Sequence, residues 1–562
     1  MYLQKYRIQR SRLKFSFQVV DYYRIEYLLG KLKFFNIYIG LNCVLQEAVK
    51  WCIILALLTH CNAANILVVI PFTTKSHYIN LKPIGLELAR RGHDVTVITP
   101  YRENEYPSNY HQVMVKDTKV WDALGTGRPN VFTMVDLTSE EFHKEILWPG
   151  GLALTEVALQ SSEVQALLSS NATFDLIINE QFFQEAFNAL AIKYNAPLVL
   201  VTTHGNCMRH NFVTRNPLQW ETVTHELLDL HHSTSFLGRL RNMYFSVYEL
   251  FWWKFWYLEK QENLMRKYIQ GLPDDMPSLY DVQKNVSLML LNNHFSVDTP
   301  TAYLPNIVEI GGIHVSNSTE KLPQDLQKSL DNAVNGVVYV NFGSNVRSSE
   351  LSQEKKQAFL NVFRRLKQTI IWKWEDDKLE DKPKNVVIRK WLPQAAILAH
   401  PNVKVFVSHG GLIGTQEAIF HGVPLISVPV YGDQLNNVLT LEHIGIGKLL
   451  NYHEITEEKL FQLINEMINN KTYTAKAKEV AKRFVDRPLS ALDTAVFWIE
   501  YIIRNNGASY MKNPAIQLNW FAYTMLDVYC LIVFIIIIFV NLVSLICRFL
   551  FMNRMMDKKK IE

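Results

Sequence analysis

The residues best suited to chemistry lie close together in one stretch of the chain, from Trp391 to Gln434. Trp391 offers a flat indole on which a nucleobase can stack, and Gln394 offers an amide that can pair with the polar edge of such a base. Asp433 and Gln434 form a carboxylate–amide pair that suits a polyol, because each side chain can make two hydrogen bonds. Taken alone, the Trp-x-Pro-Gln sequence would more often be a structural loop anchor.

A Ser-His-Gly-Gly turn, Ser408 to Gly411, lies between these two groups and directly follows an apolar run. Glycine lets a backbone approach an anion closely, and the N-terminus of a following helix offers unpaired N–H groups to a phosphate. His409 and Ser344 can donate hydrogen bonds as charge grows on a leaving phosphate, and Thr415 is a further candidate contact. The order of these groups predicts a nucleotide-sugar pocket.

A candidate base lies far upstream, where Ser76-His77 follows the apolar run from Asn65 to Phe72. Imidazole titrates near neutral pH and can accept the proton of an attacking hydroxyl. A lone loop histidine is more often structural, but the position of His77 between an expected strand and an expected helix favours the catalytic interpretation.

The segment from Trp391 to Gln434 resembles the signature of the UDP-glycosyltransferases, which include animal UDP-glucuronosyltransferases and insect UDP-glucosyltransferases. The resemblance extends from about residue 65 to the C-terminus and is strongest in this segment. It implies that Asp433 and Gln434 hold the hexose and that UDP is bound by Ser344, Trp391, Gln394, His409, Gly411, Thr415 and Glu417, with Glu417 at the ribose. Many vertebrate and plant members carry Asn where this chain has Ile413, which puts one phosphate or acceptor contact in doubt but leaves the pocket intact.

The same resemblance implies a catalytic pair. His77 stands where the family has its catalytic histidine, and Glu180 stands near the position of the family's partner Asp, one methylene longer. The implied reaction is an inverting displacement in which His77 takes the acceptor proton and UDP leaves toward Ser344 and His409. Because the chain has no Asp-x-Asp to ligate a metal at the diphosphate, we expect neither a metal nor another cofactor.

Apolar runs separated by helical patterns predict two α/β halves. The first begins with a strand at Asn65 to Phe72, a helix and a second strand, and the second begins again with a strand at Gly336 to Phe342. Two doubly wound, Rossmann-like halves place a cleft between them, which is the GT-B fold of the resembled family. We expect an acceptor-binding domain at residues 65–295, a UDP-sugar-binding domain at 296–504 and a stalk at 505–527.

Two apolar segments near the ends predict a route to the membrane. Trp51 to Leu58, followed by small residues up to Ala64, is typical of a secretory signal peptide, with a buried strand as the alternative. Residues 528–547 are long enough to span a bilayer, and the basic tail at 548–562 favours a cytosolic C-terminus. We therefore expect a single-pass type I protein with a lumenal body, which Lys559-Lys560 would return to the endoplasmic reticulum as a dilysine signal unless the pair is only a positive-inside anchor.

The leader at residues 1–64 is unusually long and basic for a signal peptide, which an over-extended gene model or an unusual cytosolic n-region would explain. Cys207 is the one cysteine between this leader and the apolar segment at 528–547, so no intramolecular disulfide is possible in the body. Four Asn-x-Ser/Thr triplets are candidate glycosylation sites: Asn171, Asn285, Asn317 and Asn470.

The formal charge of +5 over 562 residues, with basic residues dispersed outside the termini, argues against a nucleic-acid partner. Residues 71–76 contain no Gly-x-Gly-x-x-Gly, which argues against a dinucleotide oxidoreductase. We expect UDP-glucose or UDP-glucuronate as donor. The sequence as a whole resembles the insect members of the family, which favours UDP-glucose. The expected acceptor is a small lipophilic alcohol or phenol, conjugated for detoxification or as a hormone, pigment or odorant.

Two alternatives stay open at this stage. The chain could be a catalytically weak, lipophile-binding member of the same fold, and it could form homo- or hetero-oligomers. The aromatic stretch from His225 to Tyr268 could be ordinary helical core, or it could form a wall for a greasy acceptor or a surface that rests on the membrane.

Overall fold

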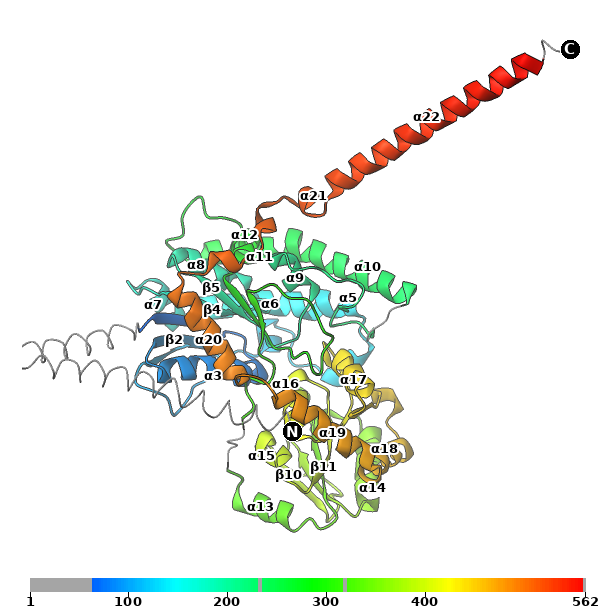
Figure 1. Cartoon of the computed structure of the whole chain (residues 1–562). Coiled ribbons are helices and arrows are strands. Elements are labelled where there is room, and N and C mark those ends of the chain that lie inside the picture. The colour runs from blue at the N-terminus through cyan, green and yellow to red at the C-terminus, as the bar shows by residue number, and fades with distance from the viewer. Residues whose placement is uncertain (1–62, 231–234, 317–320, 559–562) are drawn as a thin grey trace, which may run out of the picture. The chain divides into compact units, whose positions relative to one another are not determined.

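The structure, a computed structural model, describes residues 63–230, 235–316 and 321–558 (Figure 1). The predicted signal peptide, nearly all of the basic leader, Asn317 and the Lys559-Lys560 pair lie outside the described residues. A single compact unit begins at Ala64 and contains everything described below.

The first half is built on a sheet of seven parallel strands in the order β3-β2-β1-β4-β5-β6-β7. The direction of winding reverses between β1 and β4, whose residues Leu67 and Ile177 are paired. The central strands β1, β5 and β6 are mostly apolar and buried because helices cover both faces of the sheet. Their bounds are β1 Asn65–Val69, β2 Asp94–Thr99, β3 Tyr110–Met114, β4 Leu176–Glu180, β5 Leu198–Val201, β6 Leu288–Leu291 and β7 Ile307–Glu309.

The second half repeats this plan with six parallel strands in the order β10-β9-β8-β11-β12-β13. Its winding reverses between β8 and β11, which pair in parallel through Ser408 and Asn341. The predicted pair of doubly wound halves is therefore confirmed. The strand bounds are β8 Val337–Asn341, β9 Thr369–Lys373, β10 Val386–Arg389, β11 Val403–Ser408, β12 Leu425–Ser427 and β13 Gly447–Leu449.

Helices connect the strands, and their ends follow local capping rules. Ser352 and Thr456 accept backbone hydrogen bonds at the starts of α14 and α18, and Gly422, at φ +68°, ends α16 in a left-handed conformation. The helices of the first half are α3 Lys75–Arg90, α4 Val120–Ala123, α5 Ser139–Glu141, α6 Trp148–Gln160, α7 Ser162–Leu168, α8 Leu190–Lys193, α9 Met208–Thr214, α10 Phe236–Trp252, α11 Leu258–Tyr268 and α12 Leu279–Lys284. Those that follow are α13 Gln324–Asp331, α14 Gln353–Arg365, α15 Gln394–Leu398, α16 Leu412–His421, α17 Gln434–His443, α18 Glu457–Asn469, α19 Lys471–Val485 and α20 Ala491–Arg504.

The two halves do not divide where the sequence predicted. The expected boundary between residues 295 and 296 separates β6 from β7, yet these neighbouring strands belong to one sheet. Helix α20, expected in the second domain, returns to the first half, where Val496 and Ile499 join the core beneath β1 and β2. Helix α20 therefore lies beside the first half although it follows the second half in the sequence (Figure 1).

A segment of the first half is also built into the core of the second. Phe132, in the short 3-10 helix at Val131–Asp136, stacks on Tyr452 at 4.8 Å and meets Phe342 edge-on at 6.2 Å. Nearby, Arg128 donates to both carboxylate oxygens of Glu350, at 3.0 and 2.8 Å. These contacts tie the walls of the cleft to each other.

The C-terminal segment ends in α22, Leu526–Lys558, which contains the apolar stretch predicted at 528–547. Its part from Leu526 to Asn553 is 28 residues long and contains an 18-residue window with a mean hydropathy of 3.2, none of which is buried. By length and composition this helix can cross a bilayer. The stalk before it includes the short helix α21, Trp520–Tyr523, where Tyr523 lies under the Arg215 guanidinium at 4.2 Å.

Candidate active site

A cavity of about 910 Å³ lies between the two halves and receives side chains from both. Most of the residues singled out from the sequence line it: His77, Ser344, Trp391, Gln394, His409, Gly411, Glu417, Asp433 and Gln434. Glu180 and Thr415 lie behind the wall. The fold thus brings together, in one cavity, candidate residues that lie up to hundreds of positions apart in the sequence.

His77 and Glu180 meet because the strands that carry them are neighbours at the reversal point of the first sheet. His77 is in the first turn of α3, just after β1, and Glu180 is the last residue of β4. The imidazole Nδ1 contacts Glu180 Oε1, and Thr203 Oγ1 lies 3.2 Å from the same nitrogen. Gln184 donates to the other carboxylate oxygen at 3.0 Å. With Nδ1 held in this way, Nε2 is the nitrogen left for a ligand.

The surroundings of His77 are aromatic and were not predicted as part of the site. Phe72 stacks on the imidazole with ring centres 5.2 Å apart, and Phe182 meets it edge-on at 4.7 Å. Both rings line the cavity, together with Met134, Phe142, Ile146 and Leu147 from the first half. Phe72 lies three residues after the end of β1 and Phe182 two residues after the end of β4, so their position just beyond the strand ends is the signal that could have found them.

The second half supplies a tight loop around His409, which follows β11. A Cβ atom added at Gly343 would lie 2.8 Å from the imidazole, and one at Gly411 would lie 2.5 Å from it. Burial, with a smaller contribution from Lys373, lowers the His409 pKa to about 4, so the ring is neutral at physiological pH. Its Nδ1 is buried and has no hydrogen-bond partner among the described residues.

Gln394 and Glu417 form a pair inside the cavity wall. The Gln394 amide nitrogen donates to Glu417 Oε2 at 2.5 Å, and its oxygen accepts from Asn341 at 2.6 Å and from the Tyr339 hydroxyl at 3.2 Å. Both ends of the amide are therefore engaged within the protein, whereas the sequence suggested an amide free to pair with a base. Burial raises the Glu417 pKa to about 7, although the bond from Gln394 opposes this.

Trp391 keeps its indole accessible, with 54% of the residue exposed.

At the other end of the stretch from Trp391 to Gln434, the side-chain oxygen of Gln434 accepts hydrogen bonds from the backbone N–H groups of Val430 and Tyr431, at 2.8 and 3.2 Å. Only its amide nitrogen is left to serve a ligand. Burial raises the Asp433 pKa, and the negative charge of Glu226 raises it further.

Ile413, where the family pattern differs, takes part in a bridge between the halves. Its carbonyl lies 3.2 Å from His314 Nε2, and His314 Nδ1 lies 3.1 Å from the Asn80 amide on α3. His314 lines the cavity and was not predicted. Thr415 is buried on the same helix, and its hydroxyl has no hydrogen-bond partner in the described part of the chain.

The remaining sequence candidates lie at the surface. Asn171, Asn285 and Asn470 are exposed, as a glycosylation acceptor must be. Asn470 also caps α19, because its side-chain oxygen accepts the Thr472 backbone N–H at 3.1 Å. Their modification stays a prediction.

Comparison with known proteins identifies the kind of chain that carries this site. The family model described as UDP-glucoronosyl and UDP-glucosyl transferase matches residues 65–561. UDP-glycosyltransferase UGT5 of Dactylopius coccus is 34% identical over 479 residues, which cover 84% of this chain and 89% of that protein. UDP-glucuronosyltransferase 2B19 of Macaca fascicularis is 27% identical over 480 residues, 81% of this chain and 88% of that protein.

Solved structures share the fold. Phytolacca americana UGT2, complexed with UDP-2fluoro-glucose and pterostilbene, has a TM-score of 0.52 at 18% identity over 79% of this chain and 100% of that one. A UDP-glucosyltransferase from Polygonum tinctorium has a TM-score of 0.51 at 16% identity, over 79% of this chain and 99% of that one. The GT-B arrangement expected from the sequence is thus confirmed.

The loop around His409 generates a first prediction. In Gly411→Ala the new Cβ would lie 2.5 Å from His409 Nε2, so the imidazole must move. We expect the affinity for UDP, measured by calorimetry, to fall at least about tenfold, which is about 1.4 kcal/mol. The melting temperature should stay close to that of the parent, because the collision is confined to the cavity wall. Unchanged UDP affinity would show that this loop does not hold the nucleotide.

Proposed function

Because this chain belongs to the UDP-glucuronosyl and UDP-glucosyl transferase family, we propose that it moves a hexosyl group from a UDP-sugar to a hydroxyl of a small lipophilic acceptor, with inversion. The observation that carries this proposal is the pair of His77 and Glu180 facing the His409 loop across one cavity. The same observation disfavours a purely lipophile-binding role, which would not need a buried carboxylate behind a cavity-facing imidazole.

The donor is proposed to lie along the second half. Trp391 stacks on the uracil, and the Gln394–Glu417 pair holds the ribose hydroxyls, since the amide is tied to this carboxylate and not free for the base. The diphosphate rests against the start of α16, where backbone N–H groups and the helix dipole favour negative charge. Ser344 and His409 donate hydrogen bonds there, and Thr415 supports the same helix.

Transfer is proposed as a single displacement. The acceptor hydroxyl gives its proton to His77 Nε2, and its oxygen forms a bond to the anomeric carbon as the bond from that carbon to the diphosphate oxygen breaks. UDP leaves with that electron pair on the side of His409. Glu180 holds Nδ1–H and stabilises the imidazolium that forms. The helix terminus and neutral donors stabilise the leaving diphosphate, so we propose that the step needs no metal at the diphosphate.

A neutral hexose fits the sugar end better than a glucuronate. Asp433 and Gln434 are proposed to bind the hexose hydroxyls, and the negative charge of Glu226 reaches Asp433 and outweighs the smaller, opposite effect of His77. Two carboxylates close to this end of the cavity would repel the carboxylate of a glucuronosyl donor. We therefore propose UDP-glucose, as the name of the relative UDP-glucosyltransferase 2 from Dactylopius coccus, 33% identical over 494 residues, also suggests.

The acceptor is proposed to be a small lipophilic alcohol or phenol that comes from the membrane. Apolar side chains surround His77, and α10 presents an outward apolar stripe that includes Phe236, Leu240, Tyr244, Val247 and Phe251, each 47–69% exposed. The stripe continues to Phe255, which lines a groove with Trp520 in the stalk before α22. An apolar stripe next to a membrane-spanning helix suits a lipid surface.

We propose that α22 anchors the protein as a type I membrane protein of the endoplasmic reticulum, with the body in the lumen. Detoxification, or conjugation of a hormone, pigment or odorant, would suit such a location. The anchor, the apolar stripe and the cavity then lie on one route for an acceptor dissolved in the bilayer.

His77→Ala should remove the base and leave the donor site intact. We expect turnover of a phenol with UDP-glucose to fall by about 10² to 10⁴, with UDP affinity unchanged. Glu180→Gln should lower turnover less, because the amide still orients the ring but stabilises the imidazolium poorly. His111→Ala, at an exposed histidine elsewhere, is the control. Near-normal turnover by His77→Ala would refute the assignment, and parallel assays with UDP-glucuronate test the choice of donor.

The raised pKa of Glu417 makes donor binding depend on pH. This carboxyl is neutral below about pH 7 and ionised above it, and ribose hydroxyls bind better to the ionised form. Between pH 8 and pH 6 the ionised fraction falls about tenfold, so the affinity for UDP-glucose should fall by about the same factor. Glu417→Gln should bind weakly and show no such dependence. A flat pH profile for the parent protein would contradict the ribose assignment.

If acceptors reach the cavity from the bilayer, changes to the apolar stripe should affect acceptors that dissolve in lipid and leave water-soluble acceptors unaffected. In lipid vesicles, the double change Phe251→Ser and Phe255→Ser should raise KM several-fold for a phenol that partitions into lipid, because the stripe no longer lies in the bilayer surface. KM for a water-soluble phenol should not change. Val334→Ser, at a 90% exposed site in the second half, is the matched control. An equal effect on both phenols would point to damage within the cavity.

A further inference from the structure

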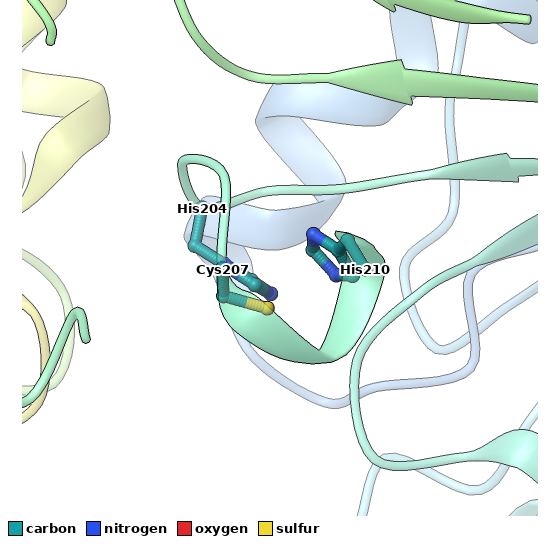
Figure 2. Close-up of side chains that lie close together, drawn as sticks. All are labelled: His204, Cys207 and His210. Carbon is teal, nitrogen blue, oxygen red and sulfur yellow. The ribbon is translucent and has the colours of Figure 1, made fainter. Parts of the chain in front are cut away.

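A second group of reactive side chains lies beside the active site, on the segment that follows β5. His204, Cys207 and His210 occur at equal spacing, two in the connecting loop and the third in the first turn of α9 (Figure 2). All three are buried, at 9%, 0% and 0% exposure. One potential ligand atom from each lies within 4.8 Å of those of the others.

The protein engages the polar atoms of these side chains only through its backbone, at Gly205 for His204 and at His210 for the Cys207 thiol. Both ring nitrogens of His204 and both of His210 are buried without a side-chain hydrogen-bond partner among the described residues. Buried polar groups in folded proteins are nearly always paired, so four buried nitrogens without a side-chain partner around one thiol call for a ligand.

We propose that His204, Cys207 and His210 bind a Zn²⁺ ion. Two imidazoles and a thiolate are donors that Zn²⁺ prefers, and on binding Cys207 would release its thiol proton to solvent. His204 also lines the large cavity, so a water molecule from that side would complete the coordination. This site goes beyond the proposed transfer reaction and does not rest on it.

Binding requires a small rearrangement of the rings. His204 and His210 stack with centres 5.1 Å apart and planes 26° from parallel, whereas a shared ion must lie close to the plane of each ring. One ring must therefore turn about its side-chain bonds. Among the described residues no side chain forms a hydrogen bond to any of the four nitrogens, so His210 in particular can turn without losing one.

The surrounding charges suit a cation despite the nearby Arg209. Its guanidinium is held by Glu249 at 3.3 Å and stacks over Phe183 at 4.5 Å, so its charge is largely offset. The carboxylate of Glu226 is close enough to act on both His204 and Cys207. A divalent ion therefore meets negative charge on this side of the site.

A second cluster, His143, His225 and Glu249, shows the contrast. There the carboxylate of Glu249 accepts from His225 at 2.9 Å and also lies near His143 and Arg209, at 3.5 and 3.3 Å. Its charge is already matched by protein groups, so it has no need of an ion. Of these two clusters among the described residues, the one around Cys207 combines ligand atoms with unpaired ring nitrogens.

The bound ion would affect the active site indirectly, by fixing the loop that carries Thr203. Thr203 precedes His204 and lies 3.2 Å from His77 Nδ1, on the side opposite the cavity-facing nitrogen. A bound ion would fix the connection from Thr202 to Met208 and so hold Thr203 against the imidazole. The role assigned is structural support for the base, separate from the diphosphate.

The test uses the full-length protein in detergent, stripped of metal and titrated with Co²⁺ and then Zn²⁺. We expect one ion per chain by elemental analysis, a thiolate-to-Co²⁺ absorption band that Zn²⁺ abolishes, and a higher melting temperature with Zn²⁺. Cys207→Ser should lose the band, and His210→Gln should weaken Zn²⁺ binding more than about tenfold. Cys530→Ser, in the membrane helix, is the matched control and should keep both.

Three results would overturn the proposal, and a separate measurement shows that the variants are folded. Absence of the band in the parent, or a band that persists in Cys207→Ser, would overturn the proposal. Retained UDP affinity in Cys207→Ser and His210→Gln shows that both variants are folded, so a lost band then reports the missing ligand. Unchanged Zn²⁺ binding in folded His210→Gln would also overturn it.

Discussion

At the point where a doubly wound sheet reverses its winding, two neighbouring strands end side by side and their connections leave in opposite directions. Here that happens twice, between β1 and β4 and between β8 and β11. The first reversal brings His77 to Glu180, and the second brings the Gly343 loop to His409. The cavity exists because these two edges face each other, and every proposed step of the transfer uses a residue from one edge or the other.

The two sheet edges must also be held at a fixed distance from each other, and other contacts do this. The segment around Phe132 is embedded in the second core, Arg128 pairs with Glu350, and α20 returns from the second half to the first sheet. Asn80 and His314 add a polar bridge to Ile413 within the cavity. These contacts join the two halves, so they set the distance between the proposed base on one sheet and the proposed donor site on the other.

The sequence predicted the strands and most of the cavity residues because both follow local rules. Continuous apolar runs indicate buried parallel strands, and polar or glycine residues directly after them indicate a ligand edge. The position of β7 and α20 could not be predicted in this way, because it depends on which distant surface their apolar faces meet. The same holds for Gln394, whose residue type suggests a free amide but whose neighbours Asn341, Tyr339 and Glu417 engage both of its ends.

The aromatic stretch shows why composition alone could not separate core from surface. Trp253 and Tyr257 are fully buried, whereas Phe251 and Phe255, at the same four-residue spacing, are 52% and 61% exposed. Each pair lies along its own side of one continuous helical run, so both interpretations of the stretch apply to different residues. The buried side completes the core beneath the acceptor end of the cavity, and the exposed side needs an apolar surface that a bilayer next to α22 would provide. In the proposed membrane-anchored arrangement, this helical run packs into the body with one apolar side and meets the lipid surface with the other.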